Sequence, residues 1–210
     1  PYNLPLVAIG GALLWFGWYG FNAGSELIAN HISVLAFLNT NLSAASSALI
    51  WLLLDYFLVR KSKLSSFFIG SIAGLAAITP AVGYVSPQIA ILIGVFAGIF
   101  CFICLFIQEK YKFDDTLDVF CIHGVSSIVG VIMLGIFASK LINPAGNNGL
   151  YYGNGHFFLI EIISLFVVGV YSFVISYLIL FIINKCVRIK VDLSQQKVGL
   201  DESFHGEKVN

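Results

Sequence analysis

A histidine and an aspartate lie close together in one of the most apolar parts of the chain. The stretch reads D-V-F-C-I-H-G-V-S-S-I-V-G, with Asp118 at its start and His123 five residues further in. A neutral imidazole offers one hydrogen-bond donor and one acceptor, and burial favours this neutral form. Such a group suits contact with a small, neutral, polar molecule that crosses apolar surroundings. The alternative role of His123 is that of a packing residue whose hydrogen bonds are satisfied inside the protein.

The residues spaced around His123 extend this candidate site along one face of a helix. Phe120, Ser127 and Gly130 lie three, four and seven positions away from it. Residues at these spacings are neighbours on the surface of an α-helix. We therefore expect one stripe that combines an aromatic ring, an imidazole, a hydroxyl and a glycine.

Three other ionisable groups in the apolar segments have simpler interpretations. Asp118 falls in the first turn of the predicted helix, where a carboxylate complements the helix dipole, and residues 114–115 are suited to cap that helix. Asp55 and Glu161 each lie near the end of an apolar segment, as anchors at the membrane surface do. Because a membrane interior tolerates few ionisable groups, the more deeply placed His123 is the strongest functional candidate.

A second candidate site lies near the start of the chain, in W-F-G-W-Y-G-F-N-A-G-S. Gly20 and Gly24 have the G-x-x-x-G spacing that lets two helices approach closely. In one interpretation the stretch is a packing motif with aromatic residues at the membrane interface. In the other, Trp18 and Phe21 project into a constriction, and Asn22 and Ser25 form hydrogen bonds with a solute. Periodicity alone does not choose between these interpretations.

Membrane-spanning helices are the elements that must position these residues. The chain is 59% hydrophobic and 10% charged, with a mean hydropathy of +0.93. A soluble domain needs a polar surface that this composition cannot supply, so we expect a multi-pass membrane protein. The formal net charge of zero gives no indication of a nucleic-acid partner.

Six segments are candidate spans of an all-α membrane bundle, because about 20 apolar residues cross the bilayer core. The third is short and ends at a T-P-A-V-G-Y stretch, which breaks a helix. We expect the bundle to occupy residues 1–186 and a polar tail, which needs a surface to fold against, to occupy residues 187–210. The six segments are Leu4–Gly24, Ser33–Val59, Leu64–Ile78, Ile89–Ile107, Leu117–Ser139 and Phe157–Ile183.

The distribution of lysine and arginine predicts how the bundle is oriented. Basic residues lie between the second and third segments, between the fourth and fifth, and after the sixth, whereas the alternate loops contain only Lys140. By the positive-inside rule, the basic loops are cytoplasmic. We therefore expect an integral protein of the plasma or inner membrane whose first residue and C-terminal tail both lie in the cytoplasm.

The cysteines do not indicate a redox or metal site. Cys101 and Cys104 form a C-F-I-C stretch inside an apolar run, with no adjacent charge that would stabilise a thiolate. We interpret them as small buried hydrophobic residues. The spacing of the four cysteines in the chain does not match a zinc site, and we expect no cofactor.

Five stretches that follow one another along the chain resemble stretches of a known family. They read NLPLVAIGGALLWFGWYGFNAGS, FLNTNLSAA, ITPAVGYVSP, DVFCIHGVSSIVGVIMLGIFAS and GLDESFHGE. Together they resemble the ammonium transporter family, which includes the Amt, Mep and Rh proteins. The resemblance implies eleven transmembrane helices, two inverted five-helix halves and a conduction path between those halves. This chain resembles helices six to eleven, and its start at Pro1 rather than at a methionine leads us to expect a C-terminal fragment.

The resemblance also implies roles for the candidate residues. His123 matches the second of two paired pore histidines, and Trp18 matches a tryptophan close to the pore. Phe21 matches one of two stacked phenylalanines that gate the outer mouth, and Ser25 matches a hydroxyl that recruits ammonium there. Asp118 matches an aspartate whose role is structural. The same motifs place Phe120 in the pore and give structural roles to Gly20, Gly24 and Gly124.

The chain departs from the family pattern at a few positions. Tyr19 stands where phenylalanine is usual, and Ser126 and Ser127 follow His-Gly-Val where a glycine is more typical. The partner histidine and the other gating phenylalanine belong to helices that this sequence does not contain. These departures affect the packing beside His123 and leave its pairing to the rest of the protein.

The implied mechanism follows from the cost of moving a cation through an apolar pore. A bare ammonium ion in a low dielectric costs on the order of 20 kcal/mol, whereas aromatic rings offset about 2 kcal/mol. The resemblance implies that ammonium binds outside and loses a proton, and that ammonia then crosses past His123. It also implies a homotrimer of full-length chains and a PII-type signalling protein as a partner of the tail.

Three alternatives remain open at this point. The first is a non-conducting, truncated product. The second is a sensor or regulatory subunit that binds ammonium without transporting it. The third, an intramembrane enzyme, lacks a convincing nucleophile–base pair, although Ser127 lies one turn from His123. We therefore expect a protein that is not an enzyme.

Overall fold

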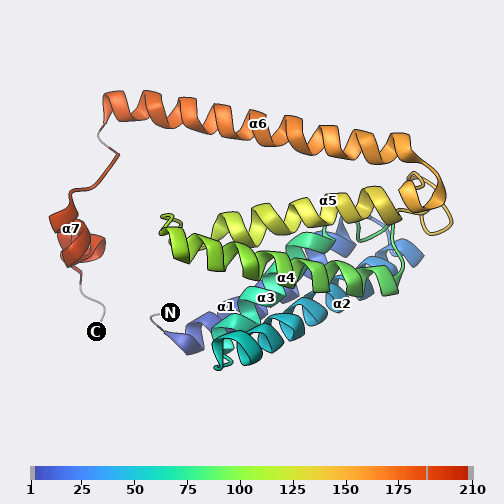
Figure 1. Cartoon of the computed structure of the whole chain (residues 1–210), viewed down its shortest axis with the longest axis horizontal. Coiled ribbons are helices and arrows are strands. Elements are labelled where there is room, and N and C mark those ends of the chain that lie inside the picture. The colour runs from blue at the N-terminus through green and yellow to red at the C-terminus, as the bar shows by residue number, and fades with distance from the viewer. Residues whose placement is uncertain (1–2, 188, 208–210) are drawn as a thin grey trace. The chain divides into compact units, whose positions relative to one another are not determined.

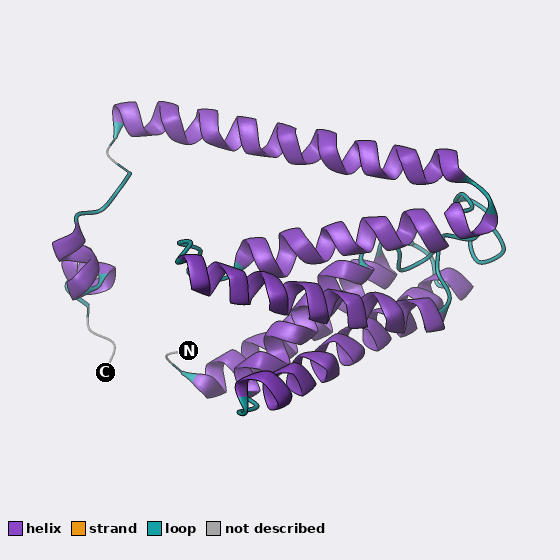
Figure 2. Ribbon diagram, viewed as in Figure 1, coloured by secondary structure: helices purple, strands orange, loops and turns teal. Residues whose placement is uncertain are grey.

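The computed structural model of the chain describes residues 3–187 and 189–207. Every regular element among these residues is a helix (Figure 2). The α-helices are α1 Leu4–Gly24, α2 His31–Leu54, α3 Leu64–Ile78, α4 Pro87–Tyr111, α5 Ser126–Phe137, α6 Gly155–Cys186 and α7 Leu193–Val198. Three π-helices, η1 Asp55–Val59, η2 Phe120–Val125 and η4 Asp201–His205, and one 3-10 helix, η3 Leu150–Tyr152, complete the described elements.

Five helical segments among the described residues are long and apolar enough to cross a membrane. They are Leu4–Gly24, His31–Val59, Pro87–Tyr111, Phe120–Phe137 and Gly155–Cys186. The shorter apolar helix Leu64–Ile78 is the third predicted segment. The prediction of an all-α membrane protein is thus confirmed, with five full-length spans and one short helix.

Local chemistry determines where the first two helices begin. Asn3 precedes α1, and its side-chain oxygen accepts a hydrogen bond of 3.0 Å from the Leu6 amide. Asn30 precedes α2 and forms a capping box with Ser33, in which each side chain accepts a hydrogen bond from the other residue's backbone amide. These contacts satisfy amide groups that have no partner within the helix.

Helix α2 packs most extensively on α3 and α4 (Figure 1). Small side chains make this close packing possible: a Cβ atom added at Gly74 or Gly94 would collide with the backbone carbonyl group of Ser43. Small residues at helix interfaces let backbones approach closely in membranes. Helix α1 packs against α2 and α3, and α5 packs against α3 and α4.

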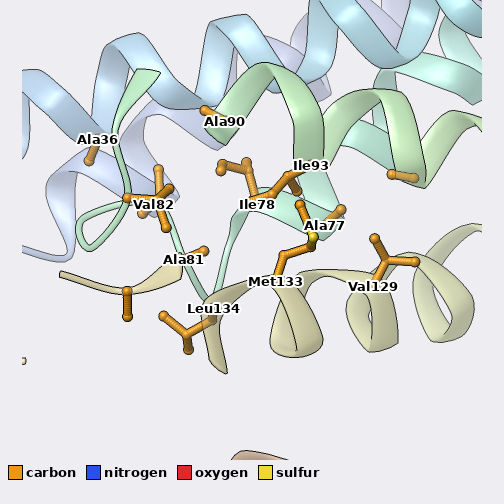
Figure 3. Packing of buried hydrophobic residues seen from close by; sticks show 13 residues of the cluster. Ala36, Ala77, Ile78, Ala81, Val82, Ala90, Ile93, Val129, Met133 and Leu134 are labelled. Atoms are coloured by element: carbon orange, nitrogen blue, oxygen red, sulfur yellow. The ribbon is translucent and has the colours of Figure 1, made fainter. Parts of the chain in front are cut away.

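A hydrophobic core joins α3, α4 and α5 (Figure 3). Ile78 and Ile93 are fully buried, and Met133 and Leu134 of α5 belong to the same cluster. Asn39 of α2 supports this region, because its Nδ2 donates hydrogen bonds of 2.9 Å to two backbone carbonyls in the connection between α3 and α4. The core therefore fixes the position of α3, which both candidate sites adjoin.

Backbone contacts divide the chain into two compact units, Pro1–Leu165 and Phe166–Asn210. The division falls within α6, whereas the predicted domain boundary lies at residue 186, where α6 ends. That boundary stays a prediction. In the second unit, α7 and η4 contact each other, and Ser203 Oγ donates a hydrogen bond of 3.1 Å to the Gln195 carbonyl.

Candidate functional site

The C-terminal half of α1 is held against its neighbours by polar side chains. Trp18 Nε1 donates a hydrogen bond of 3.0 Å to Thr79 Oγ1, directly after α3. Asn22 is buried, and its Nδ2 donates a hydrogen bond of 3.1 Å to Thr40 Oγ1 of α2. Tyr19 OH donates a hydrogen bond of 2.6 Å to Asn41 Oδ1 of α2. These three contacts fix the rotation of α1 about its own axis.

Because α1 is fixed in this way, Phe21 projects from it and remains 61% exposed. Its ring packs edge-on against Trp18, with 6.0 Å between the ring centroids. The hydroxyl of Ser25 donates a hydrogen bond to the Phe21 carbonyl, one helical turn back. Trp18, Phe21 and Ser25, which the sequence predicts as site residues, therefore lie together at one end of α1.

A pocket of about 280 Å³, which we call the first pocket, opens beside this end of α1. Its only charged lining residue is Glu26, which accepts a hydrogen bond of 2.8 Å from the Asn30 side chain. The pocket combines one carboxylate, two aromatic rings and several side-chain oxygens, a combination that suits a small cation. Its lining consists of Phe21, Asn22, Ser25, Glu26, Ile32, Ala36, Thr79, Val82, Gly83, Tyr84 and Asn143.

His123 lies outside the first pocket, in the π-helix η2 that leads into α5. Its side chain is exposed, as is that of Phe120, which is 63% exposed. A Cβ atom at Gly124 would lie 3.2 Å from Phe120 Cδ2, so glycine leaves room for that ring. Helix α3 contacts η2 and also contacts α1. The two candidate sites thus adjoin the same helix without sharing a pocket.

The predicted stripe around His123 is wrong in one respect. Gly130 does not share the exposed face of His123, because it is buried where α5 packs against α3, next to the Ala77 carbonyl. Ser127 is half-buried. The prediction assumed α-helical spacing, whereas residues 120–125 form a π-helix, whose wider turn changes the register.

Asp118 does not lie inside the helix whose start it was predicted to occupy. Its backbone has a left-handed φ of 54° just before η2, and its carboxylate accepts a hydrogen bond of 2.9 Å from Gln108 Nε2 of α4. Asp115 caps the helix instead, as one of the two predicted capping residues, and accepts a hydrogen bond of 2.8 Å from the Phe120 amide. Burial and the neighbouring carboxylates of Asp115 and Glu109 raise the pKa of Asp118, against the lowering effect of the Gln108 hydrogen bond.

The close helix approach predicted at Gly20 and Gly24 is not made within the described part of the chain. A Cβ atom added at either position would meet no atom within 4 Å. By contrast, a Cβ atom at Gly11 of the same helix would collide with the ring of Phe68. Because no described helix packs closely on Gly20 or Gly24, their packing role stays a prediction.

The interpretation of the C-F-I-C stretch is wrong for one of its cysteines. Cys101 is buried and free, as expected. Cys104 is only half-buried, and it forms a disulfide with Cys121, which links α4 to η2. The sequence spacing pairs Cys101 with Cys104 within α4, whereas the partner of Cys104 is Cys121 of η2, which packs beside α4.

Several residues of the first pocket were not predicted from the sequence. Glu26, Thr79, Tyr84 and Asn143 are separated by up to more than a hundred positions and meet only in the folded bundle. One local signal was present: T-P-A-V-G-Y marks a break after α3, and such breaks expose backbone and side-chain polar groups. The sequence alone did not show which helix end this break would adjoin.

The Ammonium Transporter Family matches residues 1–210 of the chain. This chain belongs to the ammonium transporter family. An ammonium transporter of Bacillus subtilis (strain 168) is 38% identical to it over 209 residues, which cover 99% of this chain and 52% of the relative. An ammonium transporter of Aquifex aeolicus (strain VF5) is 41% identical over 209 residues, with coverages of 99% and 49%. The chain thus spans about half the length of these curated relatives.

Solved structures of the family have the same fold. The crystal structure of Candida albicans Mep2 superposes with a TM-score of 0.87 at 32% identity, and the match covers 93% of this chain and 44% of that one. A structure described as a sensor Amt protein superposes with a TM-score of 0.85 at 33% identity, with coverages of 96% and 49%. The family resemblance predicted from the five sequence stretches is confirmed.

Proposed function

We propose that the protein moves ammonium across a membrane by recruiting the cation on the outer side and passing ammonia along an apolar path. The observation that carries this proposal is the first pocket, in which the Glu26 carboxylate, the Ser25 hydroxyl and the Phe21 ring line one cavity. A carboxylate attracts the cation, an aromatic face stabilises it, and a hydroxyl can accept a hydrogen bond from one of its N–H groups. Membership of the ammonium transporter family supports ammonium as the cation.

Deprotonation before passage follows from electrostatics. The ion costs on the order of 20 kcal/mol to transfer into a low dielectric, far more than an aromatic site returns. Neutral ammonia needs only a hydrogen-bond partner along the way, and a neutral His123 offers both a donor and an acceptor. The exposed Phe120 and His123, both next to α3, are the residues we assign to this path.

The rest of the assembly belongs to the same proposal. The distribution of basic residues among the loops supports a cytoplasmic position for both the start of α1 and the tail. The path would lie between this chain's exposed α1 and η2 surfaces and a second, inverted half, which agrees with general transporter architecture. A homotrimer and a PII-type protein at the tail are the partners that the family suggests.

The decisive experiment measures ammonium and methylammonium uptake by the complete protein in liposomes. His123→Ala is expected to change the rate or the ammonium selectivity of uptake, because the only imidazole in η2 is removed. His156→Ala, at an exposed position at the start of α6, is the matched control. Unchanged uptake and selectivity in His123→Ala would remove His123 from the path.

Recruitment is tested separately. Ser25→Ala is expected to raise the concentration of ammonium that gives half-maximal uptake while leaving the maximal rate nearly unchanged. Such a change indicates loss of binding rather than loss of a step along the path. A lower maximal rate with an unchanged half-maximal concentration would contradict the recruitment role.

A sensor is the second candidate function, favoured by the structural similarity to the sensor Amt protein. It predicts saturable binding of ammonium to the complete protein with no measurable uptake in the same liposomes. Uptake that follows the binding curve would exclude a role restricted to sensing.

A further inference from the structure

A second pocket, of about 200 Å³, lies at the opposite end of α2 from the first. The end of α2, the start of α3, the C-terminal part of α4 and the residues before η2 contribute to it. The positive-inside rule places this end of the bundle in the cytoplasm. Nothing in the function proposed above uses this pocket.

The pocket contains a buried carboxylate that lacks a partner. Asp55 lines it, is 4% exposed, and has no hydrogen-bond partner for its Oδ2 atom. Burying a carboxylate is costly unless it is hydrogen-bonded or has a cation beside it. The interpretation of Asp55 as a surface anchor is therefore wrong, because an anchor would lie exposed at the membrane surface.

The surroundings of Asp55 favour a bound cation. Glu109 and Asp118 line the same pocket, so three carboxyl groups face a single basic lining residue, Lys63. The Lys63 side chain is exposed, which leaves it a hydrated partner at the rim. The field inside the pocket thus attracts a further positive charge.

The ligands available fit a small monovalent cation better than a metal ion. No group of three or more histidine, cysteine or acidic side chains lies close enough to hold a metal in the described part of the chain. Calcium and magnesium require about six oxygen ligands. Ser65 and Ser66 add hydroxyl acceptors, and the Trp51 and Phe102 rings add aromatic surface. Hydroxyls and one buried carboxylate can accept hydrogen bonds from the N–H groups of an ammonium ion. Aromatic rings stabilise that ion further through cation–π contacts.

We propose that Asp55, assisted by Asp118 and the hydroxyl of Ser66, binds an ammonium ion at the cytoplasmic end of the bundle. The choice of ammonium and of the membrane side rests on the proposed function; the presence of a cation site rests on the pocket. The fraction of protein molecules that hold an ammonium ion at this site would rise with the ammonium concentration in the cytoplasm.

The test measures thermal unfolding of the complete protein in detergent while ammonium chloride replaces sodium chloride at constant ionic strength. A ligand that binds only the folded state raises the unfolding temperature, and the rise grows with the logarithm of the ligand concentration once that concentration exceeds the dissociation constant. The wild-type protein is expected to unfold at a higher temperature as ammonium replaces sodium. Asp55→Asn is expected to lose this response or to need at least a tenfold higher ammonium concentration. Asp114→Asn, which removes an exposed carboxylate outside the pocket, is expected to respond as the wild type does.

A stability measurement and a second variant keep the test decisive if Asp55→Asn is difficult to produce. In sodium buffer that variant should unfold at the same temperature as the wild type or higher, because it replaces a buried carboxylate oxygen that has no hydrogen-bond partner. Asp118→Asn is the second variant, and asparagine tolerates the left-handed backbone at this position. It is expected to weaken the ammonium response several-fold.

Three results would overturn the proposal. They are an unchanged ammonium response in Asp55→Asn, an equal response to potassium and ammonium, and saturation by micromolar calcium or magnesium. Uptake measured on the same preparations separates this proposal from the proposed function. Uptake without an Asp55-dependent response refutes only the cytoplasmic site, whereas an Asp55-dependent response without uptake refutes only transport.

Discussion

Gly130 is the position where one added methyl group should disturb the bundle most clearly. It lies on α5 at the contact with α3, and a Cβ atom there would lie 2.9 Å from the Ala77 carbonyl carbon and 3.0 Å from Pro80 Cγ. Contacts of this kind normally measure about 3.5–4.0 Å between carbon atoms. Because a backbone group and a proline ring cannot rotate away, Gly130→Ala must push the two helices apart.

The expected cost follows from this geometry. Overpacking a core typically costs about 1–3 kcal/mol, and contact with backbone atoms places this site near the upper limit. For a chain of this size, 1 kcal/mol corresponds to roughly 2–4 °C in the unfolding temperature. Gly130→Ala is therefore expected to lower that temperature by about 6–12 °C. Replacing Ala77 with glycine should not restore stability, because the collision involves the Ala77 carbonyl group and not its side chain.

The assay is thermal unfolding followed by the fluorescence of Trp15, Trp18 and Trp51, all of which lie in the first compact unit. Gly10→Ala is the matched control, since a Cβ atom at Gly10 of α1, in the same compact unit, would meet nothing within 4 Å. The control should unfold within about a degree of the wild type or slightly above it, because alanine favours helix. An unchanged unfolding temperature in Gly130→Ala would refute the close contact between α3 and α5.

Two further substitutions test the hydrogen bonds that position the first pocket. Trp18→Phe removes the donor to Thr79 and should cost about 1 kcal/mol, with up to a tenfold rise in the ammonium concentration for half-maximal uptake. Trp15→Phe is its control, because Trp15 Nε1 is buried without a partner and its loss should leave stability equal or higher; an equal effect of both substitutions would contradict this reasoning. Asn39→Ala leaves two backbone carbonyls after α3 without their donor, and should cost about 2–4 kcal/mol in thermal unfolding; a cost below about 1 kcal/mol would show that water replaces the amide.

Hydrophobic segments and cap signals predicted much of the fold. The segments Leu4–Gly24 and Leu64–Ile78 coincide with α1 and α3. Helices α4 and α6 extend beyond their predicted segments, and α4 continues to Tyr111 through polar residues. The fifth segment, Leu117–Ser139, was predicted too long, because the helical stretch there runs only from Phe120 to Phe137, after the left-handed Asp118. An apolar run marks the part of the chain that contacts lipid or core, so it locates a helix without fixing the residues at which that helix begins and ends.

Which helices pack together could not be read from hydrophobicity. The G-x-x-x-G spacing predicted close packing at Gly20 and Gly24, yet the glycines that allow close packing include Gly74 and Gly94, opposite Ser43. In an apolar solvent, both the buried and the exposed face of a helix are apolar, so composition does not separate them. The partner of each small residue depends on the tertiary structure.

The irregular backbone around His123 explains both what the sequence predicted correctly about this segment and where it was wrong. An α-helix through residues 118–130 would place Phe120, His123 and Gly130 on one face. Instead, Asp118 adopts a left-handed conformation and residues 120–125 form a π-helix. As a result, the aromatic ring and the imidazole stay exposed while Gly130 packs against α3.

This arrangement separates two tasks that a regular helix would place on one face. Gly130, which follows the π-helix, fixes the distance between α5 and α3. Phe120 and His123, within the π-helix, remain free to face another surface. π-helical turns occur frequently at functional sites because the insertion redirects side chains without ending the helix. A deletion of one residue within Phe120–Val125 that restores α-helical spacing should therefore keep the bundle folded, yet rotate His123 away from its present face and abolish uptake. Wild-type uptake in such a deletion would show that the π-helix has no role in presenting the histidine.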